Sequence, residues 1–290
     1  AATVTATFNL IPDLAPDAIN NSWGYGGGNY PEFDDEITAL QAAGILVEVS
    51  AGNEGPSCST LRSPGDYSGV LTTGSVNHAV GPLPGTLTDF SSRGPSLLSS
   101  EFLPNVMAPG ENIRSSVPGG GYENWYGTSM AGPHVTGLIG LLWDANPGLR
   151  GLVAETQQII FSTSIPLSGQ TGSNCGGDYD LGPNNDWGYG TIDALAAVQA
   201  AMSVGGVGTL QGTVTDSSNT DPLEGAAISA ALNADLIWLM RSNAAGEFSR
   251  LVFSGTYTVT AELYGYYPDI ATGIEVISGT TTVHDIAMDP

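Results

Sequence analysis

The hydrophobic pattern of the first 200 residues alternates short apolar runs with longer stretches of helical spacing. Four runs rich in apolar or β-branched side chains predict buried strands, at residues 18–21, 45–50, 70–76 and 106–108. Four stretches predict helices, at residues 33–43, 128–145, 151–162 and 192–202. Strands that alternate with crossover helices indicate an α/β fold built on a parallel sheet.

The pattern changes after a small-residue linker at residues 204–208. Helical spacing stops, and residues 209–216, 256–263 and 273–279 alternate as half-buried antiparallel strands do. In the second of these runs the apolar positions that share one face are Tyr257, Val259, Ala261 and Leu263. We therefore predict an α/β domain over residues 1–203 and a small all-β sandwich over residues 209–290.

The excess of acidic residues limits which kinds of partner this chain can bind. The chain has 29 acidic residues against 6 basic ones, all arginine, and a net charge of −23. Such a surface repels phosphate backbones and anionic lipids, so we expect no nucleic-acid binding. No run reaches the roughly 18 apolar residues of a membrane span, and residues 1–10 lack the features of a signal peptide, so we expect the chain to begin within a longer precursor.

One short segment carries the strongest chemical signal, GTSMAGPHV at residues 127–135. It predicts a glycine-led turn into a helix that accepts Pro133 in its first turn, with Ser129 at the helix N-terminus. There the Ser129 N–H lacks an intrahelical acceptor and points, with the helix dipole, at an anion forming beside the hydroxyl. From these residues alone, a nucleophilic serine and an ordinary N-terminal capping serine are both open.

The two cysteines, Cys58 and Cys175, allow one intramolecular disulfide or two free buried thiols. The disulfide would close a loop of more than a hundred residues, for which chain entropy gives roughly 4–5 kcal/mol.

Residues 127–135 resemble the serine motif of the subtilisin-like (subtilase) family, with Gly132 where that family usually has serine or threonine. The resemblance spans roughly residues 8–202 and is greatest to the bacillopeptidase-like branch, in which two cysteines occur in similar contexts. Four further segments resemble family signatures in the expected order: APDAINNSWG at 15–24, SAGNEGPSCS at 50–59, FSSRGP at 90–95 and MAPG at 107–110.

The resemblance implies a serine endopeptidase with Ser129 as nucleophile and Asn53 as a side-chain donor to the oxyanion. It also implies that two segments clamp an extended substrate backbone and wall the primary specificity pocket: Ser22, Trp23 and Gly24, and opposite them Ser50, Ala51 and Gly52. From the residues alone, an asparagine between glycines such as Asn53 is more often a turn residue, and a core aromatic is the alternative interpretation of Trp23.

A serine hydroxyl needs a base and an orienting acid, which in this family precede the serine in the order aspartate, histidine. No residue here stands in either family context, so we expect both upstream of the chain. His134 matches the structural histidine that follows the serine, and neither His78 nor His284 stands in a catalytic context.

Calcium, which family members often bind, is the one cofactor to consider. Carboxylates gather at Asp34, Asp35 and Glu36, and again at Asp178, Asp180 and Asp186. Their spacing fits no loop template, and solvated surface is the favoured interpretation.

Residues 209–290 are similar to carboxypeptidase regulatory-like (transthyretin-like) modules, which carry no chemistry. The overall expectation is a secreted endopeptidase that cleaves extracellular proteins through an acyl-enzyme on Ser129. The alternative from another class is a non-catalytic polypeptide-binding or surface protein on a degenerate subtilisin scaffold.

Overall fold

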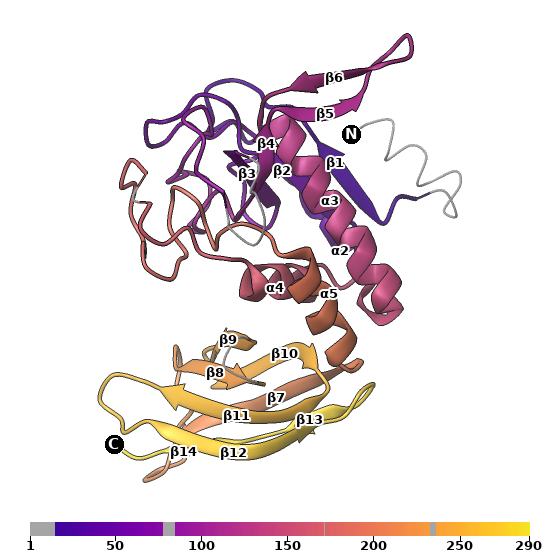
Figure 1. Cartoon of the computed structure of the whole chain (residues 1–290). Helices are drawn as coiled ribbons and strands as arrows, with labels where there is room; N and C mark the ends of the chain where they lie inside the picture. The colour runs from indigo at the N-terminus through magenta and orange to yellow at the C-terminus, as the bar shows by residue number, and fades with distance from the viewer. Residues whose placement is uncertain (1–14, 78–84, 171, 233–235) are drawn as a thin grey trace. The chain divides into compact units, whose positions relative to one another are not determined.

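The structure, a computed structural model, describes residues 15–77, 85–170, 172–232 and 236–290 (Figure 1). The chain divides into two compact units between residues 198 and 199. None of the helices in the described ranges has the length and apolar character of a membrane span.

Four parallel strands form the sheet of the first unit, in the order β1-β2-β3-β4. Their bounds are Ala18–Asn21, Leu46–Ser50, Leu71–Asn77 and Val106–Glu111. The four predicted strands and the α/β class with a parallel sheet are thereby confirmed.

Within the described ranges the helices are α2 (Asp34–Ala42), α3 (Thr128–Ala145), α4 (Val153–Thr163) and α5 (Ala194–Ser203), with a 3-10 turn, η2, at Pro147–Leu149. Two predicted helix starts were too early. Gly151 has a φ of 82°, which lies outside the helical region, so α4 begins after it. Asp193 is the N-cap residue of α5, because its carboxylate accepts a hydrogen bond from the Ala196 N–H.

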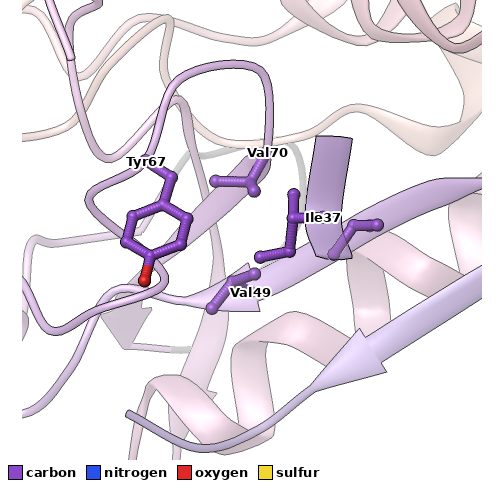
Figure 2. Close-up of a cluster of buried hydrophobic side chains, with 5 residues drawn as sticks. Ile37, Val49, Tyr67 and Val70 are labelled. Atoms are coloured by element: carbon purple, nitrogen blue, oxygen red, sulfur yellow. The ribbon is translucent and has the colours of Figure 1, made fainter. Parts of the chain in front are cut away.

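Strand β2 is buried on both faces, as a central parallel strand requires. Val47 and Val49 pack on one face with Ile37 of helix α2. Figure 2 shows this cluster, with Ile37 directed toward Val49 and with Tyr67 and Val70 beside them. The alternate residues, Glu48 and Ser50, face helix α3, which packs against all four strands. Helix α3 and the ends of these strands position the site described below.

A hairpin that the sequence pattern did not predict precedes α3. Its strands are β5 (Ile113–Ser116) and β6 (Tyr122–Trp125), and Arg114 lies 4.9 Å from the centre of the Tyr122 ring.

The second unit contains two four-stranded sheets. One has the order β10-β7-β13, with β14 also paired to β7, and the other has the order β12-β11-β8-β9. The strand bounds are β7 Val207–Asp216, β8 Ala227–Ala231, β9 Ile237–Arg241, β10 Glu247–Phe253, β11 Gly255–Glu262, β12 Asp269–Val276, β13 Thr281–Val283 and β14 Ile286–Met288.

The all-β class of this unit is confirmed, with two corrections. The pattern predicted antiparallel pairing, but β13 and β14 both run parallel to β7. The predicted strand at residues 273–279 lies instead at Asp269–Val276. The predicted apolar face holds for Tyr257, Val259 and Ala261, which are buried, whereas Leu263 is half-buried just beyond the end of β11.

Candidate active site

Ser129 is the second residue of helix α3, directly after a turn made by glycine. Gly127, with a φ of 142°, precedes the helix in a conformation that residues with a Cβ rarely adopt. The Gly127 N–H donates to the Gly110 carbonyl of β4, which fixes the start of the helix against the sheet. Because Ser129 lies in the first turn, its N–H has no intrahelical acceptor and is free to stabilise an anion.

Pro133 lies farther into the helix than predicted. It is the sixth residue of α3 and therefore belongs to the second turn. Proline has no N–H, so the carbonyl of Ser129, four residues earlier, loses its helical donor. The Ser22 hydroxyl takes that place and donates to Ser129 O over 3.0 Å. The Ser129 hydroxyl donates in return to Ser22 O over 3.3 Å.

Asn53 follows strand β2 and contacts the residue before Ser129. Its Oδ1 accepts hydrogen bonds from the Thr128 N–H at 2.9 Å and from the Thr128 hydroxyl at 3.1 Å. Since a backbone N–H can only donate, the side-chain atom facing it must be the oxygen. The Asn53 amide nitrogen is therefore directed away from Thr128 and is available to a ligand.

Four of the six predicted wall residues, Trp23, Gly24, Ser50 and Gly52, border one polar pocket together with Ser129. Ser50 is additionally fixed by its hydroxyl, which donates to the Thr128 carbonyl at 3.1 Å. The other two are absent from the lining: Ser22 bonds the Ser129 carbonyl through its hydroxyl, and Ala51 is fully buried in a core cluster with Leu61 and Leu103. The pocket is lined by Trp23, Gly24, Gly26, Ser50, Gly52, Asn53, Glu54, Arg62, Thr128 and Ser129.

Sequence reasoning missed three side chains of this pocket: Glu54, Arg62 and Thr128. Glu54 and Thr128 are the neighbours of Asn53 and Ser129 in the chain, and this adjacency was a usable signal. For Arg62 the sequence held a weaker signal, because the chain has only 6 basic residues. Its Nε lies 2.9 Å from Glu54 Oε2.

A carboxyl group lies beneath the nucleophile helix. Glu48 of β2 is fully buried, and neither of its carboxyl oxygens has a hydrogen-bond partner in the described structure. Burial raises the pKa of Glu48 to about 8. A Cβ on Gly132 would lie 2.5 Å from Glu48 Oε1, so only glycine leaves room for this group in α3.

The histidines lie as follows. In the described part of the first unit, His134 bonds the Met130 carbonyl through Nδ1 at 2.9 Å, while the Ser129 hydroxyl bonds Ser22. His284 belongs to the second unit, and His78 lies outside the described residues. Among the described residues, no imidazole is therefore hydrogen-bonded to the Ser129 hydroxyl.

The acidic clusters are engaged in local structure. Asp34, Asp35 and Glu36 form the first turn of α2, where negative charge suits the helix dipole. Asp178 accepts the backbone N–H groups of Asp180 and Leu181. Within the described ranges, no group of three or more His, Cys, Asp or Glu side chains is placed to hold a metal ion.

Asp186 corrects the interpretation of its cluster as solvated surface. It is fully buried and pairs with Arg93 at 3.0 Å. The same carboxylate accepts the N–H groups of Ser173 and Cys175, on either side of residue 174. Cys175 forms a disulfide with Cys58, which joins this segment to the loop that follows Asn53.

Proteins of known name are similar to this chain in sequence. Bacillopeptidase F of Bacillus subtilis (strain 168) is 40% identical over 214 residues, which are 71% of this chain and 14% of that protein. Subtilisin of Bacillus pumilus is 38% identical over 185 residues, 63% of this chain and 57% of that protein. The chain thus spans less than two thirds of the length of either relative.

Among solved structures, fervidolysin from Fervidobacterium pennivorans, described as a keratinolytic enzyme related to subtilisin, covers 98% of this chain, and this chain covers 45% of it. The TM-score is 0.52 at 20% identity, which shows a shared fold. A model of the carboxypeptidase regulatory-like domain matches residues 209–289, and the subtilase family model matches residues 2–190. The chain therefore belongs to the subtilase family.

Proposed function

We propose that this chain carries the nucleophile and the oxyanion site of a secreted serine endopeptidase. One observation carries the proposal most directly: the Thr128 N–H holds Asn53 Oδ1, which leaves the Asn53 amide to donate beside Ser129. Together with the Ser129 N–H, it supplies two donors at the point where a carbonyl oxygen would become negative.

In the proposed reaction the Ser129 oxygen attacks the carbonyl of a substrate peptide bond, the C–N bond breaks, and the amine leaves with a proton. Water then hydrolyses the acyl ester on Ser129, which releases the new carboxylic acid and restores the hydroxyl. The two donors stabilise the tetrahedral intermediate in both steps. The proton must pass to a base, and the contacts of Ser129 in the described residues include none. The proposal assigns this role to a histidine and an orienting aspartate outside the described residues.

The backbone of the substrate would lie between residues 22–24 and 50–52, with the side chain preceding the scissile bond in the pocket beside Ser129. The Cys58–Cys175 disulfide supports secretion, because such bonds persist in oxidising compartments. We further propose that residues 1–203 form the peptidase domain and that residues 209–290 are a separate β-sandwich joined by residues 204–208.

The test uses the full-length protein and a fluorophosphonate probe. Wild type should be labelled and should hydrolyse a chromogenic peptide, and Ser129→Ala should lose both. Ser162→Ala, which removes a hydroxyl from α4, is the control and should retain both. Labelling of the Ser129→Ala variant would contradict the assignment of the nucleophile.

The rival, a polypeptide-binding protein, is favoured by one observation: the Ser129 hydroxyl is held by Ser22 O. A wild-type protein that binds an unfolded polypeptide but is never labelled would support this rival.

Deletion of residues 206–290 tests the domain proposal, since hydrolysis of a small peptide should then be nearly unchanged.

A further inference from the structure

An arginine, Arg62, lines the pocket beside Ser129. The Arg62 N–H donates to the Ala51 carbonyl at 3.0 Å, which fixes the Arg62 backbone against one wall of the pocket. Its stem then fills the space between the two walls. A Cβ on Gly24 would lie 2.5 Å from Arg62 Cβ, and one on Gly52 would lie 2.7 Å from Arg62 Cγ. The side chain is therefore confined between backbone segments on both sides.

The partner of Arg62, Glu54, is held through one of its carboxylate oxygens. Glu54 Oε2 accepts three hydrogen bonds, from Arg62 Nε at 2.9 Å, from the Asn53 N–H at 2.9 Å and from the Ser92 hydroxyl at 3.2 Å. Burial acts to raise the pKa of Glu54, but these bonds and the Arg62 charge outweigh it and lower that pKa. Glu54 is therefore ionised and serves to orient the guanidinium.

Arg62 retains donors for a ligand. It uses Nε for Glu54, and within the described residues its terminal nitrogens, Nη1 and Nη2, make no hydrogen bond to the protein. The Arg62 side chain is 29% exposed and lines the pocket, so a ligand in the pocket can contact it. A planar pair of N–H donors matches a carboxylate in a bidentate arrangement.

The overall charge of −23 does not oppose an acidic ligand at this point. Charges farther away than roughly 8 Å are largely screened at physiological salt, whereas a contact pair in a partly enclosed pocket is not. Ion pairing with Glu54 orients the arginine without occupying its terminal donors.

We propose that Arg62 determines specificity and selects an acidic residue, glutamate or aspartate, immediately before the scissile bond. The inference rests on the proposed function, because it takes residues 22–24 and 50–52 as the walls that clamp a substrate. It names the substrate class that this pocket would favour.

The experiment compares four peptides that differ only at the residue before the scissile bond: glutamate, its neutral isostere glutamine, lysine and phenylalanine. In the full-length protein, kcat/KM should be highest for glutamate and at least tenfold above glutamine, the gain expected from a charge-assisted bidentate pair. Arg62→Gln should lower kcat/KM for the glutamate peptide about ten- to a hundredfold and leave the phenylalanine peptide within about threefold. Arg62→Lys, which keeps the charge but loses the planar fork, should lie in between.

Arg150→Gln is the matched control. It removes the same charge from an exposed residue that pairs loosely with Asp17 at 3.8 Å, outside the pocket, and should leave the glutamate preference intact. Thermal unfolding of each variant verifies that the pocket is still folded. Preference for lysine, equal use of glutamate and glutamine, or an unchanged preference in Arg62→Gln would each overturn the inference.

A second readout separates this inference from the proposed function. If no peptide is cleaved, hydrolysis fails as the function, and the specificity is read from binding to Ser129→Ala by fluorescence anisotropy. Labelled peptides that end in glutamate or glutamine represent the product side of cleavage. Tighter binding of the glutamate peptide, lost in the double variant with Arg62→Gln, would support the role of Arg62, and equal binding would refute it.

Discussion

Ser22 and Ser129 exchange two hydrogen bonds, one from each hydroxyl to the carbonyl of the other residue, at 3.0 and 3.3 Å. The first bond compensates for Pro133, which cannot donate to the Ser129 carbonyl within helix α3. Strand β1, through the residue after its end, is thereby tied to the turn that presents the nucleophile.

Ser22→Ala should destabilise the first unit by about 1–2 kcal/mol, because it leaves the Ser129 carbonyl without a donor in a partly buried position. Urea unfolding measures this. Ser162→Ala is the matched control. The Ser162 hydroxyl donates to Ile159 O within α4 itself, and its loss leaves no carbonyl without a donor. Equal effects of the two substitutions would contradict the compensating role of Ser22.

Asn53→Asp separates the two roles of the Asn53 side chain. Aspartate keeps an oxygen for the Thr128 N–H but cannot donate to the oxyanion. In the full-length protein, turnover should fall by about a hundredfold or more, which is the loss found in subtilisin when one such donor is removed, while the melting temperature stays close to that of wild type. Unchanged turnover would show that Asn53 has a structural role alone.

Glu48 should make stability depend on pH. Its pKa is about 8 in the folded protein and 4.5 as the unperturbed value, so between these values the folded state holds a proton that the unfolded state has lost. Stability therefore falls as pH rises, by up to roughly 1.4 kcal/mol per pH unit from this group. Glu48→Gln should remove that component. Unfolding free energies of both proteins from pH 5 to 8 test this, and parallel curves would refute it.

Gly132→Ala should cost about 1–3 kcal/mol, because the added Cβ would overlap the Glu48 carboxyl. Gly137→Ala is the control on the same helix, since a Cβ there meets no atom within 4 Å, and alanine suits a helix better than glycine. In a Glu48→Val background the cost of Gly132→Ala should shrink. A double-mutant cycle measures the coupling, and additive effects would contradict direct contact.

Replacement of Cys58 and Cys175 by serine should destabilise the protein by up to about 4–5 kcal/mol, because the disulfide closes a long loop with a sequence separation of 117 residues. Urea unfolding with and without reductant provides a second measure on wild type. Reductant should lower the midpoint of wild type and leave the serine variant unchanged. A wild-type midpoint insensitive to reductant would contradict a stabilising role.

Local order was largely predictable from the sequence. Strand β1 and helix α3 have their predicted bounds, because apolar spacing and glycine-led turns act between neighbours in the chain. The serine motif likewise indicated the family, and the cysteine count left one intramolecular pairing to consider.

Contacts between distant segments depended on the tertiary structure. The register of β2 places Glu48 beneath Gly132, 84 positions away in the chain, and the loop after β2 inserts Arg62 between Gly24 and Gly52. The local sequence pattern also did not predict that Asp186 is buried against Arg93. Nor did it predict that β13 and β14 pair in parallel with β7. Spacing along the chain determines which residues share a face of one element, whereas the packing of elements against each other decides what that face meets.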